Sequence, residues 1–222
     1  MALEDICLTI CTNAGIRVQF IIRCGDTKTG FFDIRVEGRA MAHKYLDELF
    51  SDSIKKVQEE MGSRKNYERM AERSSNDGKL TEDEVDFIQK RDSFYIASVT
   101  EDGWPYVQHR GGPIGFVHVQ NESTLIIPDY SGYRQYVTVG NTRVNNRVSI
   151  ILVDYPNRAR LKIMGHLSEI DKDDVSTPQS EYKAKVERYF KIEVVGYDWN
   201  CPQHIHPRYT VEQIEEIQKL RS

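Results

Sequence analysis

The sequence predicts a mainly β fold, a barrel or sandwich of short antiparallel strands with helices flanking it. The first observation is a series of segments rich in β-branched and aromatic residues, each bounded by turn residues. The second is that these segments follow one another closely, as they do in all-β domains. The third is that helical periodicity lies mostly outside this region. The strands are expected at 94–100, 105–110, 114–120, 123–128, 147–154 and 160–170.

The composition is that of an ordinary globular protein of 222 residues, 39% of them hydrophobic and 29% charged. The formal net charge of -4 argues against nucleic acid as a partner, because nucleic-acid-binding domains are usually basic. No apolar run approaches the length of a membrane span, and Glu4 and Asp5 stand where a signal peptide would be basic. We therefore expect a cytoplasmic protein without a membrane partner. The four cysteines form no dense framework, so free thiols are expected.

Residues 1–42 have the least regular pattern and are expected to be an atypical N-terminal extension. Short strand patterns lie at 18–23 and 31–36. Cys7 and Cys11 have helical spacing, which is compatible with a metal or redox pair, but no second pair stands at ligand spacing. The alternative interpretation is a poorly specified extension.

A helical arm is expected over 43–80, before the first strand. Apolar residues recur there every three or four positions, and a second, polar segment follows. Thr81 and Glu84 then form a capping box that opens a further helix and leads the chain into the first strand. The helices are expected at 44–61, 64–73 and 82–90.

The stretch over 93–112 predicts a hairpin that ends in a basic, glycine-rich step. Gln108 and Arg110 share one side of the second strand, with His109 on the other. Arg110 offers forked donors, and the two glycines after it let backbone approach a ligand, which suits a phosphate. A plain turn or bulge is the alternative. The candidate ligands of this step are Gln108, His109, Arg110, Gly111 and Gly112.

A second place for a phosphate precedes a helix expected over 133–145. Ser131, Gly132 and Arg134 stand at its start, where helix N-termini offer unpaired N–H groups and a partial positive charge. The two basic, glycine-containing steps flank a β-hairpin, so they can lie close together in an antiparallel barrel. Asn141 follows in the helix, where it either contacts a cofactor or caps a turn.

The C-terminal part over 176–222 is expected to hold a helix, a strand, an irregular loop and an amphipathic helix. Cys201, His204 and His206 in the loop read as C-x-x-H-x-H, a ligand pattern for zinc or haem iron, but no fourth ligand is apparent. His109 and His166 would complete it only if the fold brings them near. The alternatives are a packing role or a reactive thiol at Cys201. The four elements are expected at 181–190, 191–195, 198–209 and 211–220.

Four stretches resemble the FMN-binding split-barrel family related to pyridoxamine 5'-phosphate oxidase. The first is DSFYIASVTEDGWPYVQHRGGPIGFVHV, and the others are TLIIPDYSGYRQYVTVGN (124–141), NNRVSIILVDYPNRARLKIMGHLSEI (145–170) and DWNCPQHIHPRYT (198–210). The resemblance covers roughly 53–210 and is closest to an uncharacterised flavoprotein branch with QHRGGP and WNCPQHI signatures. It implies a six-stranded antiparallel split barrel over 81–175. It also implies a homodimer with FMN at the subunit interface.

By resemblance, Trp199 and Gln203 reach the flavin from its far side or from the other subunit. The chain departs from the oxidase proper, which has an arginine in place of Gln108 and a lysine in place of Pro113. The oxidase's C-terminal segment for pyridoxine recognition is not evident either, so the resemblance does not extend to that substrate. The cation of this strand is Arg110 instead.

The sequence therefore predicts an FMN-binding oxidoreductase, with NAD(P)H or a small molecule as its partner. The alternatives are a flavin carrier or sensor without turnover, and a haem-handling split-barrel protein. No catalytic acid or base is assigned, because no two titratable residues are forced together by spacing.

Overall fold

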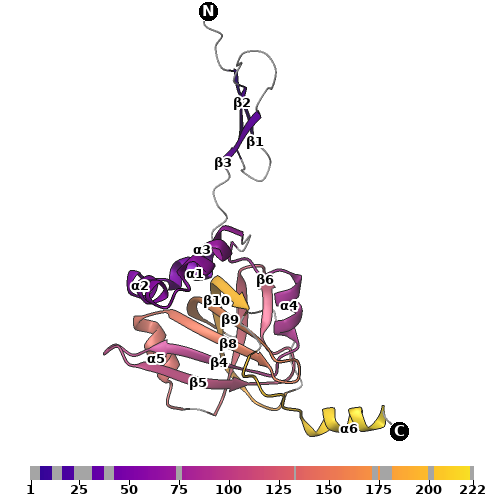
Figure 1. The fold of residues 1–222 in the computed structure, drawn as a ribbon. Helices are drawn as coiled ribbons and strands as arrows, with labels where there is room; N and C mark the ends of the chain where they lie inside the picture. Colours follow the sequence, from indigo (N-terminus) through magenta and orange to yellow (C-terminus); the bar gives the residue numbers. More distant parts are fainter. Residues whose placement is uncertain are drawn as a thin grey trace, which may run out of the picture. The chain divides into compact units, whose positions relative to one another are not determined.

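The structure is a computed structural model (Figure 1). The chain divides into two compact units, residues 1–43 with 53–75 and residues 44–52 with 76–222. The residues described are 6–11, 17–22, 32–37, 43–73, 77–132, 134–171, 175, 182–199 and 203–220.

The first unit holds a three-stranded antiparallel sheet and two helices. The strands pair in the order β1-β2-β3, and two of them agree with the predicted strand patterns to within one residue. Cys7 and Cys11 lie in β1, so the helical interpretation of their spacing is wrong, and their side chains lie outside the described part of the chain. The elements are β1 (Ile6–Cys11), β2 (Arg17–Ile22), β3 (Phe32–Glu37), α2 (Asp52–Glu60) and α3 (Arg64–Arg73).

The second unit is built on a seven-stranded antiparallel sheet in the order β5-β4-β8-β9-β10-β7-β6. Alternate residues of β4, β8 and β9 face one apolar core; on β4, Phe94 and Ile96 are buried while Tyr95 is not. The strands are β4 (Ser93–Val99), β5 (Pro105–Gly111), β6 (His118–Asn121), β7 (Thr124–Tyr130), β8 (Arg147–Asp154), β9 (Ala159–Ile170) and β10 (Val186–Trp199).

The sheet curls so that strands from its two ends face each other. Arg110 lies on β5 at one end of the strand order, and Asp129 lies on β7 near the other end. Their side chains nevertheless form an ion pair, with 2.5 Å between Nη1 and Oδ1. A flat sheet would keep these strands several strand widths apart. The prediction of a mainly β antiparallel barrel is therefore confirmed, with one strand more than the six expected.

Helix α1 (Lys44–Leu49) covers the outer face of the sheet over β9 and β10. A Cβ on Gly196 would lie 2.8 Å from the backbone N of Tyr45, so only glycine permits this close approach. On the neighbouring strand, Lys162 points away from the core and places Nζ 5.2 Å from the centre of the Tyr45 ring. The outer face of β4 and β5 has no such cover in the described part of the unit.

Three further helices complete the second unit. In α4 (Glu82–Gln89), Phe87 and Ile88 join the core, and the predicted capping box of Thr81 with Glu84 is present. Helix α5 (Val137–Val144) follows β7 and contacts β4 and β9. Helix α6 (Val211–Lys219) is exposed along its whole length and ends the described chain at the lower right of Figure 1.

Some predicted boundaries are wrong. The helix expected over 181–190 is not formed, because from Val186 onward the chain is strand β10, which pairs with β7 and β9. Pairing on both sides places Phe190 and Ile192 in the core. The helix expected over 44–61 is two helices, α1 and α2. The strand expected over 114–120 begins only at His118, and α5 begins at Val137.

Candidate functional site

Strand β5 presents Gln108 and Arg110 to the inside of the barrel, as the alternation predicts. In the pairing of β4 with β5, Gln108 is opposite Ile96 and Arg110 is opposite Phe94, and both of these partners are buried. His109 points to the outer face, where its ring meets Tyr95 edge-on with 5.4 Å between centroids. Gln108 and Arg110 therefore share a site that His109 does not enter.

Arg110 is held in place on three sides. Its Nη1 donates to Asp129 Oδ1 at 2.5 Å, and its Nη2 donates to Gln108 Oε1 at 3.2 Å. The guanidinium carbon lies 4.7 Å from the centre of the Phe190 ring. The side chain is only 14% exposed, and its buried Nε has no hydrogen-bond partner among the described residues. Arg110 is therefore fixed in orientation but keeps one donor unused.

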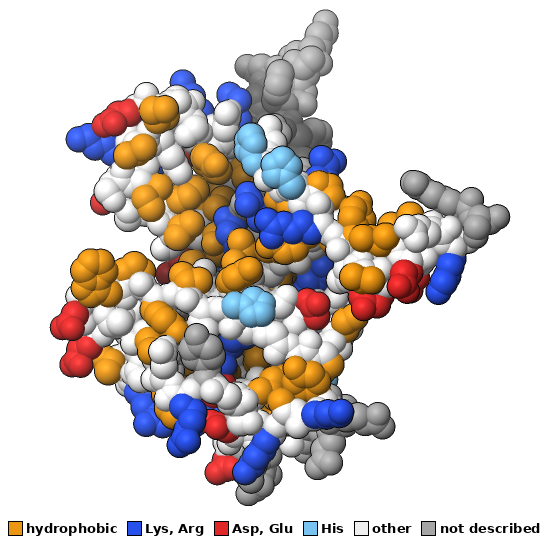
Figure 2. Space-filling view, turned by 90° about the horizontal axis from the view of Figure 1, so that it is seen from below, with side chains coloured by type: hydrophobic (Ala, Val, Ile, Leu, Met, Phe, Trp, Pro, Cys, Tyr) orange, Lys and Arg blue, Asp and Glu red, His pale blue; other side chains and the backbone are white. Residues whose placement is uncertain are grey.

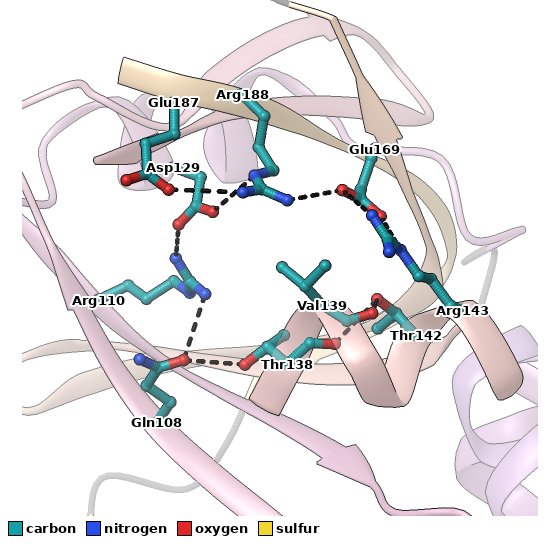
Figure 3. Close-up of polar contacts among 10 residues, drawn as sticks. All are labelled: Gln108, Arg110, Asp129, Thr138, Val139, Thr142, Arg143, Glu169, Glu187 and Arg188. Carbon is teal, nitrogen blue, oxygen red and sulfur yellow. Dashed lines mark hydrogen bonds and ion pairs between the residues drawn. The ribbon is translucent and has the colours of Figure 1, made fainter. Parts of the chain in front are cut away.

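The ion pair of Arg110 belongs to a longer cluster, shown in Figure 3. Arg188 lies 3.4 Å from Asp129 Oδ2 through its Nε, and its Nη1 lies 2.9 Å from Glu169 Oε2. Arg143 makes a two-pronged contact with the same glutamate at 2.7 and 3.1 Å. We call this set, Arg110, Asp129, Arg188, Glu187, Glu169 and Arg143, the arginine–carboxylate cluster.

The cluster is neutral within itself, because its three arginines balance its three carboxylates. The hydrogen bond from Arg143 holds the pKa of Glu169 below its ordinary value, against the effect of burial and with further help from Arg188. The carboxylate is therefore ionised at neutral pH. A phosphate that bound here would need either a further cation or an arginine released by its carboxylate.

Helix α5 contributes its first turns to the same place. Thr138 Oγ1 donates to Gln108 Oε1 at 2.8 Å, and this threonine is almost fully buried. Asn141 Nδ2 donates to Ser98 Oγ at 2.9 Å, which ties the helix to β4. The amide of Asn141 is thus used within the chain. An open pocket of about 830 Å³ lies beyond the other end of α5 and includes Arg143 and Glu169 in its lining.

Ser131, Gly132 and Arg134 lie in the loop between β7 and α5, and because α5 begins only at Val137 the prediction that they stand at the helix start is wrong. The N–H of Ser131 donates to the carbonyl of Lys185 at 2.8 Å. Gly132 has a φ of 149°, and a Cβ built on it meets nothing within 4 Å. Arg134 is exposed. Tyr136 takes a left-handed conformation before the helix and places its ring 5.4 Å from the guanidinium carbon of Arg188.

The two glycines after Arg110 have different surroundings. Gly111 ends β5 opposite Ser93, and a Cβ there would find only ordinary contacts at 3.4 Å or more. A Cβ on Gly112 would lie 2.7 Å from the ring of Phe116, which stacks on Phe94. The N–H of Gly112 already donates to the carbonyl of Asp92 at 2.9 Å. Core packing therefore accounts for Gly112 without a ligand.

Trp199 ends strand β10 and is fixed against α4. Its Nε1 donates to Glu84 Oε1 at 2.5 Å, and its ring meets Phe87 edge-on with 4.8 Å between centroids. Burial alone would raise the pKa of Glu84, but hydrogen bonds from Thr81, Trp199 and Tyr197 outweigh it and hold that pKa below its ordinary value. Trp199 also lines a pocket of about 470 Å³ beside α4.

The predicted site residues fall into two groups, one near each end of β10. Arg110 lies over Phe190 near the start of β10, and Trp199 is nine residues further along it. At 3.3 Å per residue this separation is about 30 Å along the strand. Gln203 is exposed in the segment that follows. Within one chain, Gln108 and Arg110 therefore lie together beside α5, whereas Trp199 lies far from them.

The loop pattern of Cys201, His204 and His206 is only partly described. Cys201 lies outside the described residues. Both histidines are exposed, and Ile205 between them is half-buried. Within the described part of the chain, no three His, Cys, Asp or Glu side chains converge as metal ligands. No helix among the described residues has the length and apolar character needed to cross a bilayer.

Several residues of the arginine–carboxylate cluster, and Thr138 beside it, were not predicted. Asp129 could have been noticed as a carboxylate in an otherwise apolar strand, TLIIPDY. Arg188 lies in the segment that was predicted to be a helix, so its direction could not be inferred. Glu169 and Thr138 carry no sequence signal that separates them from surface residues.

The curled antiparallel sheet and the helix inserted after β7 define a split-barrel protein. The family model described as pyridoxamine 5'-phosphate oxidase matches residues 80–215, which is more than half of the chain. The chain therefore belongs to the pyridoxamine 5'-phosphate oxidase family. No curated protein matches it.

Several solved structures are similar to the chain. A Lactobacillus delbrueckii protein whose name refers to pyridoxamine 5'-phosphate oxidase is 21% identical, with a TM-score of 0.42, over 55% of this chain and 94% of that one. HupZ of Group A Streptococcus is 15% identical, with a TM-score of 0.41, over 59% and 99%. HutZ, the haem storage protein of Vibrio cholerae, is 17% identical, with a TM-score of 0.37, over 54% and 94%.

Proposed function

We propose that this protein is an FMN-binding oxidoreductase that acts as a homodimer. The observation that carries the proposal is the arrangement of Gln108, Arg110 and Thr138 inside the barrel, in a chain that belongs to this family. Bound FMN would supply reversible electron transfer between a reductant, such as NAD(P)H, and a small-molecule substrate.

The residues present fit a flavin phosphate in part. The buried Nε of Arg110 has no partner among the described residues, and Gly132 borders open space in the loop before α5. Because the arginine–carboxylate cluster is neutral, the added negative charge requires Arg134 or the release of Arg110 from Asp129. The role of these residues is to bind and orient the cofactor and to keep water from it. Trp199 and Gln203 would join the site from the second subunit.

An absorption spectrum of the purified protein, with mass analysis of the released cofactor, tests the cofactor assignment. Two flavin bands and the mass of FMN are expected, and a Soret band after haem addition would favour haem handling instead. Rapid oxidation of NAD(P)H distinguishes an oxidoreductase from a flavin carrier or sensor. Deletion of residues 1–42 should leave FMN binding intact, since none of the proposed contacts lies there; loss of FMN from a folded truncation would contradict this.

A further inference from the structure

Helix α6 has an apolar side that nothing in the described chain covers. Val211, Ile214 and Ile217 recur every third residue along it, and even the least exposed of them, Ile217, is 38% exposed. The helix starts with a capping box between Thr210 and Gln213, so its beginning is well specified. A helix of nine residues is nevertheless marginal in water without a surface to pack on. We therefore expect the apolar side of α6 to pack against a partner surface.

The outer face of β4 and β5 is an apolar surface that no described helix or strand covers. Tyr95 and Val99 of β4 and Val107 of β5 point outward, in the register that turns Ile96 inward, and Val107 is 62% exposed. Trp104, in the turn that joins the two strands, is 75% exposed. An exposed apolar patch of this kind on a globular domain usually marks an interface. Figure 2 shows hydrophobic side chains exposed on the underside, where β5 and α6 lie in Figure 1.

The start of the C-terminal arm is anchored at the edge of this same face. The guanidinium carbon of Arg208 lies 4.8 Å from the centre of the Tyr155 ring, and Tyr155 in turn hydrogen-bonds Tyr95 on the outer face of β4. From this anchor α6 extends away from the barrel in both views (Figures 1 and 2). A two-fold axis beside the anchor would lay each helix on the β4–β5 face of the other copy, and the contact would be reciprocal and closed.

The charges suit the same arrangement. The polar side of α6 carries Glu212, Glu215 and Glu216, and its net charge is negative. Exposed cations, Arg158 and Arg208, stand near the anchor, at the turn after β8 and in the segment before α6. In a two-fold pair the acidic helix of one copy would approach the basic anchor region of the other.

We propose that α6 docks on the outer β4–β5 face of a second copy of this chain. This inference rests on the homodimer of the proposed function and names the elements that form it. Each copy provides a helix and receives one, so both unpaired apolar surfaces are buried together. The flavin contacts proposed at Gln108 and Arg110 face the inside of the barrel and are not part of this contact.

Two charge-introducing variants test the contact from its two sides. Val107→Glu alters the face, and Ile214→Glu alters the helix. Each should raise the dimer dissociation constant, measured by sedimentation, by about tenfold or more, since a charge would be buried without a partner. Lys219→Gln changes the charge of α6 by the same amount on its polar side and should not raise the constant. Circular dichroism and an unchanged thermal unfolding midpoint show that the barrel of each variant is intact.

Combining the variants decides where the helix docks. If α6 meets the β4–β5 face, the double variant should be no weaker than the worse single variant, because one contact cannot be lost twice. Mixing Val107→Glu chains with Ile214→Glu chains should form heterodimers more tightly than either homodimer, since one intact helix–face contact remains. The proposal would be overturned if the single variants leave the dissociation constant unchanged. It would also be overturned if the effects of the two substitutions add in the double variant, or if mixed chains form heterodimers no tighter than the homodimers. If the unaltered protein is a dimer but does not bind FMN, the proposed function is wrong while the docking proposal stands.

Discussion

Arg110 is proposed to bind the flavin phosphate, and its pairing with Asp129 determines how that can be tested. Replacing Arg110 alone would leave a buried carboxylate with one partner fewer, and breaking a buried ion pair commonly costs about 3–5 kcal/mol. A loss of FMN could then reflect damage to the barrel. The informative comparison is between Asp129→Asn and the double variant Arg110→Ala/Asp129→Asn, because neither contains the unpaired carboxylate.

The expected size of the effect follows from the contact. A charge-assisted hydrogen bond contributes about 1.5–3 kcal/mol, and each 1.4 kcal/mol is roughly tenfold in affinity. The double variant should therefore bind FMN about 10- to 100-fold more weakly than Asp129→Asn does. Asp129→Asn itself should bind FMN at least as tightly as the parent, because Nη1 of Arg110 no longer has a competing carboxylate.

Riboflavin provides the control ligand, since it has the ring but no phosphate. Flavin fluorescence titrations of cofactor-free protein should show a much smaller difference between the two variants for riboflavin than for FMN. Equal weakening of FMN and riboflavin would mean that Arg110 supports the barrel and does not bind the phosphate. Unchanged FMN binding in the double variant would refute the assignment as well. Arg134, exposed before α5, would then be the leading cation.

Two further predictions concern the packing around the site. Gly112→Ala should lower the free energy of unfolding by about 1–3 kcal/mol, because its Cβ would meet the Phe116 ring at 2.7 Å. Gly111→Ala should lower it clearly less in the same denaturant titrations, and equal losses would contradict the packing role of Gly112. Because the pKa of Glu84 is lowered in the folded protein, its contribution to stability is present above the ordinary value of 4.5 and is lost as the pH falls below it. Unfolding followed by the fluorescence of Trp199, with the other tryptophan replaced by phenylalanine, should show a weaker acid dependence in Glu84→Gln, and an unchanged dependence would exclude this carboxylate as the cause.

Local sequence patterns predicted the barrel well because several of its strands, such as β4 and β8, alternate between buried and less buried residues. That Gln108 and Arg110 share one side of their strand follows from a period of two, whereas the fold was needed to show that this side faces inward. The capping box at Thr81 was equally readable, since its two partners are three residues apart. Patterns of this kind depend only on residues that are close in the sequence, so they can be recognised without knowledge of the tertiary structure.

Contacts between distant segments could not be predicted in the same way. The segment from Val186 to Phe190 has enough apolar residues for a helix, and only pairing with β7 and β9 makes it a strand. Arg188 consequently has carboxylate partners from two other strands, Asp129 and Glu169. Which carboxylate neutralises which arginine depends on how far the sheet curls, and no short motif encodes that.

The length of β10 bears on the proposed site between two chains more directly than the family relationship does. Arg110 lies against its start at Phe190, and Trp199 is held at its end by Glu84, about 30 Å further along the strand. A single flavin that met both residues within one chain would require β10 to come out of its pairing with β9, which spans the same residues. A second copy can supply Trp199 without any such change. If the titrations assign the phosphate to Arg110, a flavin contact of Trp199 must therefore come from the partner, and otherwise its role is to fix α4 against the barrel.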